Sequence, residues 1–194
     1  ATHHYIYRRI SEAQDKGAKL IVINPVQTEL AKRSDLWLPL RPGSDLALAL
    51  GMINVIITED LFDRDFVGKW TTGFDELKSH IEDYTPQKVE EITWVPAEQI
   101  RQAARIYAQN KPGCIQWGNA IDQGLNSFQG ARALCILRAI TGNLGIPGGE
   151  IDTSLPPLTG RRTPKLELGD KISPEQMSLR LGQELKWLPP VRFI

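Results

Sequence analysis

The segment at residues 20–45 constrains the fold more than any other part of the chain. It reads LIVINPVQTELAKRSDLWLPLRPGSD and contains two short apolar runs, at 20–23 and 36–40. Each run ends at a polar segment that contains Pro, which is typical of a buried strand followed by a loop. In an open α/β sheet, the loops at the carboxyl ends of such strands hold the ligand. Any binding site is therefore expected at 24–28 and 43–45.

Helical patterns alternate with these runs. Helices are expected at 2–16, 28–32, 45–58, 96–109 and 126–141, and a third strand is expected at 113–117. Strand–loop–helix units joined by helical crossovers build parallel sheets covered by helices. The pattern therefore predicts an α/β fold, a Rossmann-like three-layer parallel sheet with helices on both faces.

Two regions have a different texture. Residues 59–96 are charged with scattered aromatic residues, and they predict a small helical excursion with helices at 63–70, 74–81 and 86–92. The aromatic residues at 70–74 have two interpretations, a surface that stacks on a nucleotide or packing of the short helices onto the body, and packing is favoured. Residues 151–194 lack a sustained period, are rich in Pro, Gly and Thr at first, and predict an irregular C-terminal tail after an α/β domain at 1–150. The chain opens at Ala, directly on a helical pattern, which indicates a piece of a longer protein.

Composition argues against several function classes. Lys+Arg and Asp+Glu number 23 each, so the net charge is zero and gives no reason to expect nucleic acid or an anionic membrane as a partner. No apolar run approaches the ~18 residues of a membrane span, so no direct membrane insertion is expected. Cys114 and Cys135 form no CxxC and have no nearby His cluster, which argues against a zinc or iron–sulfur site. Both are expected to be buried packing thiols.

Three polar loops follow the three expected strands, at 24–28, 41–45 and 118–123. They carry Asn, Gln, Thr, Ser and Asp beside Pro and Gly, without a Ser/His/Asp set or a pair of carboxylates suited to catalysis. This mixture favours recognition of a hydrogen-bonding ligand over bond making, so no catalytic residue is assigned. No GxGxxG follows any strand, which disfavours a nicotinamide dinucleotide site.

Asp45 has two interpretations. A fixed carboxylate accepts two hydrogen bonds side by side, which matches the N1–H and N2–H groups of guanine. Alternatively, Ser44 or Asp45 caps the helix that follows, and the pattern alone slightly favours this cap.

Three segments together resemble the central region of the bis-molybdopterin guanine dinucleotide oxidoreductases, the family of formate dehydrogenases, periplasmic nitrate reductases and dimethyl sulfoxide reductases. The first, LIVINPVQTELAKRSDLWLPLRPGSDLALALGMINVII, has the family's strand ending in Asp/Asn-Pro and its later Pro-Gly-Thr/Ser-Asp before an apolar helix. The second is the Gly-rich segment with a Gln at 118–130, and the third is LRAITGNLGIPGGE at 137–150. They occur in the family's order and spacing, and the resemblance covers about residues 1–150.

The resemblance implies that these loops bind the guanosine and phosphate end of a molybdopterin guanine dinucleotide. The first implied contact segment consists of Asn24, Pro25, Val26, Gln27 and Thr28. The second consists of Gly43, Ser44 and Asp45, with Asp45 on the guanine. Asn119 and Gln123 are implied near the pterin, and Thr2 in an earlier loop.

The family's N-terminal iron–sulfur cysteines, its metal-ligand segment and its C-terminal domain have no counterpart in these residues. The resemblance therefore implies a cofactor-binding fragment of a molybdenum or tungsten oxidoreductase, which by itself holds no metal and is inactive. Its implied partners are the remaining domains of the parent catalytic subunit and an iron–sulfur electron-transfer subunit. The competing hypothesis is a non-catalytic α/β module that binds a small ligand or a partner protein through the same loops.

Overall fold

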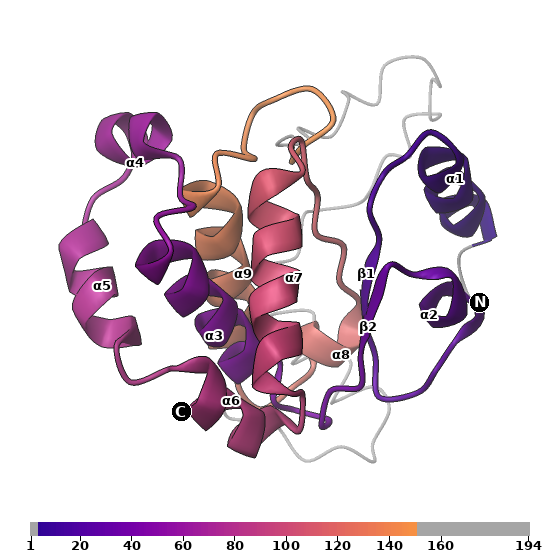
Figure 1. Ribbon diagram of the computed structural model, residues 1–194, viewed down its shortest axis with the longest axis horizontal. Helices are drawn as coiled ribbons and strands as arrows, with labels where there is room; N and C mark the ends of the chain where they lie inside the picture. The colour runs from indigo at the N-terminus through magenta and orange to yellow at the C-terminus, as the bar shows by residue number, and fades with distance from the viewer. Residues whose placement is uncertain (1–3, 151–194) are drawn as a thin grey trace, which may run out of the picture. The chain divides into compact units, whose positions relative to one another are not determined.

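The computed structural model describes residues 4–150, so Thr2 and the predicted tail at 151–194 lie outside the described residues. Within that range the chain forms helices and two short strands (Figure 1). In chain order they are α1 (His4–Asp15), β1 (Ile21–Ile23), α2 (Glu29–Arg33), β2 (Leu36–Leu38), α3 (Asp45–Thr58), α4 (Arg64–Trp70), α5 (Phe74–Ile81), α6 (Pro86–Thr93), α7 (Ala97–Gln109), α8 (Asn119–Asp122) and α9 (Ser127–Ile140). No helix between residues 4 and 150 has the length and apolar character needed to cross a lipid bilayer.

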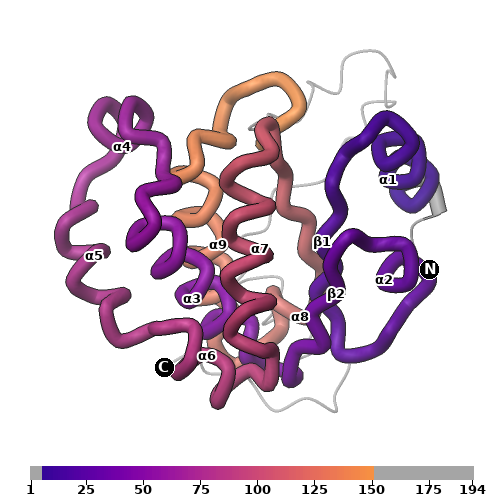
Figure 2. Tube along the Cα trace, viewed as in Figure 1, coloured from indigo at the N-terminus to yellow at the C-terminus, as the bar shows by residue number. Residues whose placement is uncertain are grey.

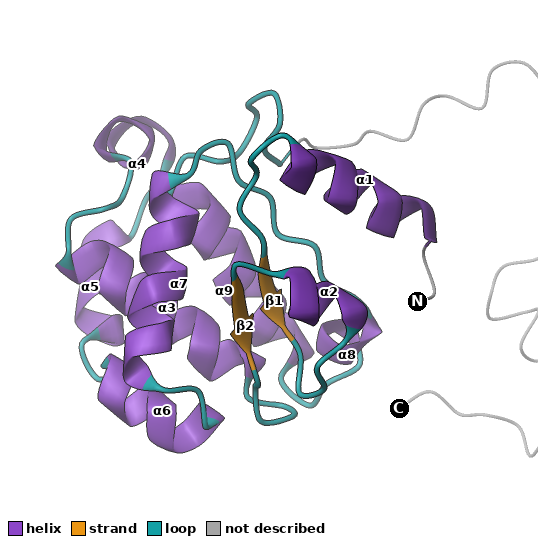
Figure 3. Cartoon of the chain, turned by 45° about the vertical axis from the view of Figure 1, so that its right-hand side comes forward, coloured by secondary structure: helices purple, strands orange, loops and turns teal. Residues whose placement is uncertain are grey.

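The first two predicted strands exist and are parallel. β1 pairs with β2 in the register Ile21↔Leu36 and Ile23↔Leu38. At their amino ends, the Asp35 carboxylate accepts the Leu20 N–H at 2.9 Å and lies 2.8 Å from the Lys19 ammonium. α2 contacts both strands and α7 contacts β2, so the strands lie between helices, as Figure 3 shows.

The third predicted strand is wrong. Residues 113–117 are extended but pair with no strand among the described residues, so the sheet there has two strands rather than the predicted wider sheet. The physical reason is that side chains take up the backbone groups of this segment. Asn143 accepts the Gly113 N–H at 2.9 Å, Glu150 accepts the Ile115 N–H, and Arg138 donates to the Ile115 carbonyl.

The core is built around α3 rather than around a sheet. This helix is apolar on nearly all sides, and its middle residues, such as Ile53 and Ile56, are fully buried. It packs against α5, α6, α7 and α9, which Figure 2 traces around it. On α7, Ala103 and Ala104 are fully buried, and their small side chains let the two helices approach closely.

The helical excursion has its three predicted helices. Asp63 and Thr85 cap α4 and α6 by accepting main-chain N–H groups, and Pro86 occupies the first turn of α6, where it loses no hydrogen bond. Phe62 and Phe74 pack together with ring centroids 4.8 Å apart, as expected.

Three residues that were expected to be buried are not. Trp70 is 76% exposed, so the packing interpretation is wrong for this residue. Cys114 and Cys135 are also exposed rather than buried. Cys114 lies on the outward side of its extended segment, where burial alternates, and Cys135 lies on the face of α9 opposite Ala133 and Leu137.

Candidate functional site

The loop after β1 begins with a tight turn. The Asn24 Oδ1 accepts the Val26 N–H at 2.8 Å, and the Asn24 carbonyl accepts the Trp37 indole N–H at 2.9 Å. These bonds fix the direction in which the chain leaves the strand, which leaves residues 25–28 exposed. Thr28 then caps α2, because its hydroxyl accepts the Ala31 N–H at 3.3 Å.

The loop after β2 is closed by Ser44. Its hydroxyl donates to the Arg41 carbonyl at 2.7 Å, and Gly43 takes a left-handed conformation with φ of +82°. The Arg41 N–H donates to the Thr93 carbonyl at 2.9 Å, which ties this loop to the end of α6. Ser44 stands at the N-cap position of α3, yet its side chain makes no capping bond because the hydroxyl is turned toward Arg41.

Asp45 is the first residue of α3 and is half-buried. Among the described residues, no hydrogen bond or ion pair engages its carboxylate, and neither Ser44 nor Asp45 caps the helix through its side chain. The capping interpretation therefore has no support in the local geometry. The first N–H groups of this 14-residue helix also lack a side-chain acceptor within that part of the chain.

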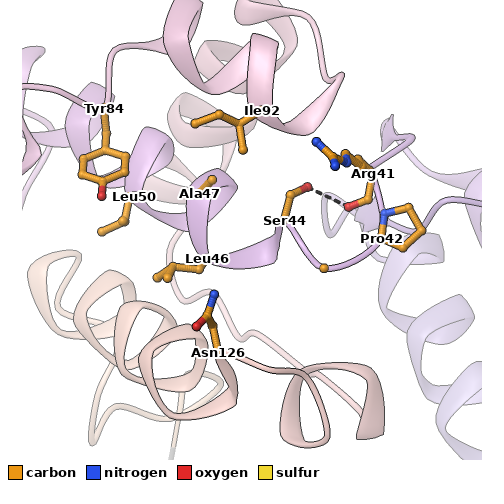
Figure 4. Close-up of a pocket in the computed structure, with 10 residues that line it drawn as sticks. Arg41, Pro42, Ser44, Leu46, Ala47, Leu50, Tyr84, Ile92 and Asn126 are labelled. Atoms are coloured by element: carbon orange, nitrogen blue, oxygen red, sulfur yellow. Dashed lines mark hydrogen bonds between the residues drawn. The ribbon is translucent and has the colours of Figure 1, made fainter.

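A cavity of about 350 Å³ borders this loop (Figure 4). The loop residues 41–44, the first two turns of α3, and single residues from neighbouring segments line it. Polar groups at its wall come from Arg41, Ser44, Tyr84 and Asn126. The Arg41 guanidinium also lies 5.3 Å from the centre of the exposed Trp94 ring. Asp45 does not line the cavity.

The third loop contains the short helix α8. Asn119 and Gln123, at its start and just after its end, are both exposed. The indole N–H of Trp117 donates to the Asp122 carboxylate at 3.0 Å, which holds the last residue of α8.

The structure brings the first two loops together directly. They follow adjacent parallel strands, and the Asn24 N–H donates to the Leu38 carbonyl at 3.1 Å, so both leave the same sheet edge. α8 lies beside the two strands in Figure 1 and in Figure 3.

The family model of the molybdopterin oxidoreductases matches residues 2–184. The chain belongs to the molybdopterin oxidoreductase family. The match extends well past residue 150, where the resemblance of the sequence motifs ends.

Curated members of the family include redox enzymes and a hydratase. The chain is 40% identical to acetylene hydratase of Syntrophotalea acetylenica over 95% of this chain and 25% of that protein. It is 42% identical to formate dehydrogenase H of Escherichia coli over 75% of this chain and 20% of that protein. The solved structure of acetylene hydratase from Pelobacter acetylenicus superposes with a TM-score of 0.71 and 46% identity over 74% of this chain and 20% of that one. The chain thus spans about a quarter or less of these molybdopterin proteins.

Sequence reasoning missed three residues that contact one another beside α8. Arg138, Trp117 and Glu150 were not singled out, although Glu150 ends the quoted LRAITGNLGIPGGE motif. The available signal was Arg138 within the otherwise apolar stretch 133–140 of α9, since a charge at such a position requires a partner. No group of three or more His, Cys, Asp or Glu side chains suited to a metal ion occurs in residues 4–150.

Proposed function

We propose that this chain is the part of a molybdenum or tungsten enzyme that holds the guanosine and phosphate end of a molybdopterin guanine dinucleotide. When bound, the metal-carrying pterin supplies the two-electron chemistry, and this chain's residues bind and orient the nucleotide end. The parent's other domains and an iron–sulfur subunit are proposed partners. The remaining strands of a wider Rossmann-like sheet are proposed to come from those domains.

The proposal depends on one observation: within residues 4–150, the Asp45 carboxylate and the first N–H groups of α3 have no side-chain partner. A guanine edge offers two adjacent N–H donors, and the Asp45 carboxylate offers two acceptor oxygens with no partner in residues 4–150. The uncapped N–H groups of the same helix turn favour a phosphate, because the positive end of the helix dipole adds to them.

The other proposed contacts come from the loops after β1 and β2 and from the segment that contains α8. Residues 24–28 leave the adjacent strand at the same edge. The Thr28 hydroxyl is used as an acceptor by α2, and its own O–H remains as a donor for a ligand oxygen. Gly43 lets the main chain approach the ligand, since a Cβ built there meets nothing within 4 Å. Asn119 and Gln123 are proposed to contact the pterin side.

Binding of GDP against ADP to the 194-residue chain tests the proposal. We expect GDP to bind with a dissociation constant on the order of 0.1–1 mM, since the rest of the site belongs to absent domains. Adenine lacks the N1–H and the N2 amine, so ADP leaves the carboxylate unpaired and should bind roughly 5- to 150-fold more weakly. Asp45→Asn should remove most of this preference, because an amide presents one acceptor where guanine needs two.

The control is Asp65→Asn, which removes a carboxylate from the first turn of α4, where it pairs with Lys69 at 2.7 Å. This variant should keep the wild-type preference in titration calorimetry. Equal affinity of the wild-type chain for GDP and ADP, or an unchanged preference in Asp45→Asn, would show that the guanine assignment is wrong.

A further inference from the structure

Arg138 connects three segments that are distant in sequence. It lies on α9 with a side chain only 15% exposed, and its guanidinium donates to the Ile115 carbonyl. Its Nε lies 3.0 Å from the Glu150 Oε1, and the guanidinium carbon lies 4.3 Å from the centre of the Trp117 ring. The Nε–H does not point at the Glu150 oxygen, so the two residues form an ion pair rather than a hydrogen bond. A planar cation held at its edge and at its face has little freedom to move.

A tight turn over residues 143–150 places the Glu150 carboxylate beside the Arg138 guanidinium. The Glu150 N–H donates to the Asn143 carbonyl at 2.8 Å, and the Gly145 N–H donates to the Glu150 carbonyl at 2.8 Å. A Cβ at Gly149 would lie 2.5 Å from the Asn143 carbonyl oxygen, so the turn needs a glycine there. The GNLGIPGGE motif therefore presents a carboxylate at one fixed place.

Trp117 links Arg138 to α8, because it contacts both. Its ring stacks on Arg138, and its N–H holds Asp122 at 3.0 Å. α8 has four residues, and its N-cap Gly118 offers no side-chain cap, so the helix has little stability of its own. It needs an external attachment to hold one conformation.

We propose that Arg138, Glu150 and Trp117 are positioning residues that fix α8, and that α8 thereby holds Asn119 and Gln123 ready for the pterin side of the cofactor. A loop ordered before binding loses less conformational entropy when its ligand arrives. This inference rests on the proposed function for its ligand, while the attachment itself is a property of the free chain.

Hydrogen exchange of the α8 amides in the 194-residue chain tests the attachment. Trp117→Phe keeps an aromatic ring for Arg138 and removes the N–H donor. One lost hydrogen bond should make the amides of Ile121 and Gln123 exchange about five-fold faster, without changing the buried amides of α3. Trp70→Phe is the control, because this Trp is exposed and ends α4.

The acceptor gives a second pair of variants. Asp122→Ala should accelerate α8 exchange as much as Trp117→Phe does. Asp122→Asn keeps an oxygen acceptor for the indole N–H, so it should retain most of the wild-type protection. If the asparagine and alanine variants exchange equally fast, the indole bond does not hold α8 and the proposal falls.

A double mutant tests whether Glu150 acts on α8 through Trp117. Glu150→Gln removes the charge that holds Arg138 and should accelerate α8 exchange by about two- to five-fold. If its effect passes through Trp117, the double variant Glu150→Gln/Trp117→Phe should exchange no faster than Trp117→Phe alone. Additive effects, or no effect of Glu150→Gln, would overturn the role of the ion pair.

The two proposals fail in different measurements. Unchanged α8 exchange in Trp117→Phe, in a chain that prefers GDP, rejects the attachment and leaves the proposed function standing. Faster α8 exchange in a chain with no GDP preference keeps the attachment and rejects the guanine assignment of the proposed function.

Discussion

Two extended regions of this molecule lead into polar loops: the strand pair β1–β2 and residues 113–117. Different hydrogen-bond partners stabilise the two regions. β1 and β2 hold each other through a parallel main-chain ladder over Ile21–Ile23 and Leu36–Leu38. Residues 113–117 have a similar extended course, yet their backbone groups are bonded by side chains from 23 to 35 residues further along the chain. The first arrangement needs only two apolar runs in register. The second needs polar side chains at Asn143, Glu150 and Arg138 to bond the backbone.

This difference predicts how each segment responds to mutation. In the ladder, the backbone bonds survive any side-chain change, so the cost comes from lost burial. At 113–117 the side chain is itself the hydrogen-bond partner, so its removal leaves backbone groups unpaired.

The largest effect is expected in the strand pair. Leu38 is fully buried, so Leu38→Ala should lower the free energy of unfolding by about 3 kcal/mol through lost burial and the remaining cavity. Chemical denaturation measures this loss. Leu125→Ala is the control, because Leu125 is fully exposed and should change stability by less than about 0.5 kcal/mol. Equal losses in the two variants would contradict the core assignment.

A smaller effect is expected from the side chain that supports the second segment. Asn143 is fully buried, accepts the Gly113 N–H at 2.9 Å and donates to the Thr141 hydroxyl at 2.8 Å. Asn143→Ala should lower the free energy of unfolding by about 2 kcal/mol, because the buried Thr141 hydroxyl and the partly buried Gly113 N–H both lose a hydrogen-bond partner. Asn110→Ala provides the matched comparison in the same denaturation experiment. Its exposed amide bonds one carbonyl of α7, at Ile106, and its loss should cost under about 1 kcal/mol.

The smallest effect concerns the amino ends of the strand pair and depends on pH. The hydrogen bond from Lys19, followed by that from the Leu20 N–H, lowers the pKa of Asp35 in the folded chain. Asp35 therefore adds stability above its unfolded pKa of about 4, and this contribution is lost as the pH falls through the lowered folded pKa.

Asp35→Asn should thus reduce stability at pH 7 by less than about 1 kcal/mol, since the side chain is partly solvated. The difference from the wild-type chain should shrink below about pH 4. A difference that stays constant from pH 7 to pH 2.5 in denaturation curves would show that the charge of Asp35 contributes nothing.

Elements whose ends are marked by neighbouring residues lie where the sequence predicts them. α3 and α5 begin and end where the pattern predicted, because residues next to their ends set the boundaries. Examples are Gly73 before α5 and the RPGSD turn before α3. The exposure of Trp70 was not predictable in this way, because the local sequence does not show whether an aromatic side chain in a short helix faces the core or the solvent.

In the candidate site, too, the parts defined by neighbouring residues were predicted and the parts defined by distant contacts were not. The loops after β1 and β2 were located by the Pro and Gly residues that end the two apolar runs. The attachment of α8 could not be located, because Arg138, Trp117 and Glu150 form one unit only after a glycine turn brings the chain back on itself.

The sequence by itself determined the helices other than α8, the two strands, their loops and the family, because each depends on residues that are close in the chain or on an ordered set of motifs. The short helix α8 lies in a segment that was predicted to be a loop. The tertiary structure decided that residues 113–117 are held by side chains, that Ser44 turns to Arg41 and leaves the start of α3 uncapped, and that the cysteines face outward. These outcomes depend on which groups meet across the fold. A backbone N–H accepts any partner with suitable geometry, and only the packing of distant segments selects between a strand, a side chain and a ligand.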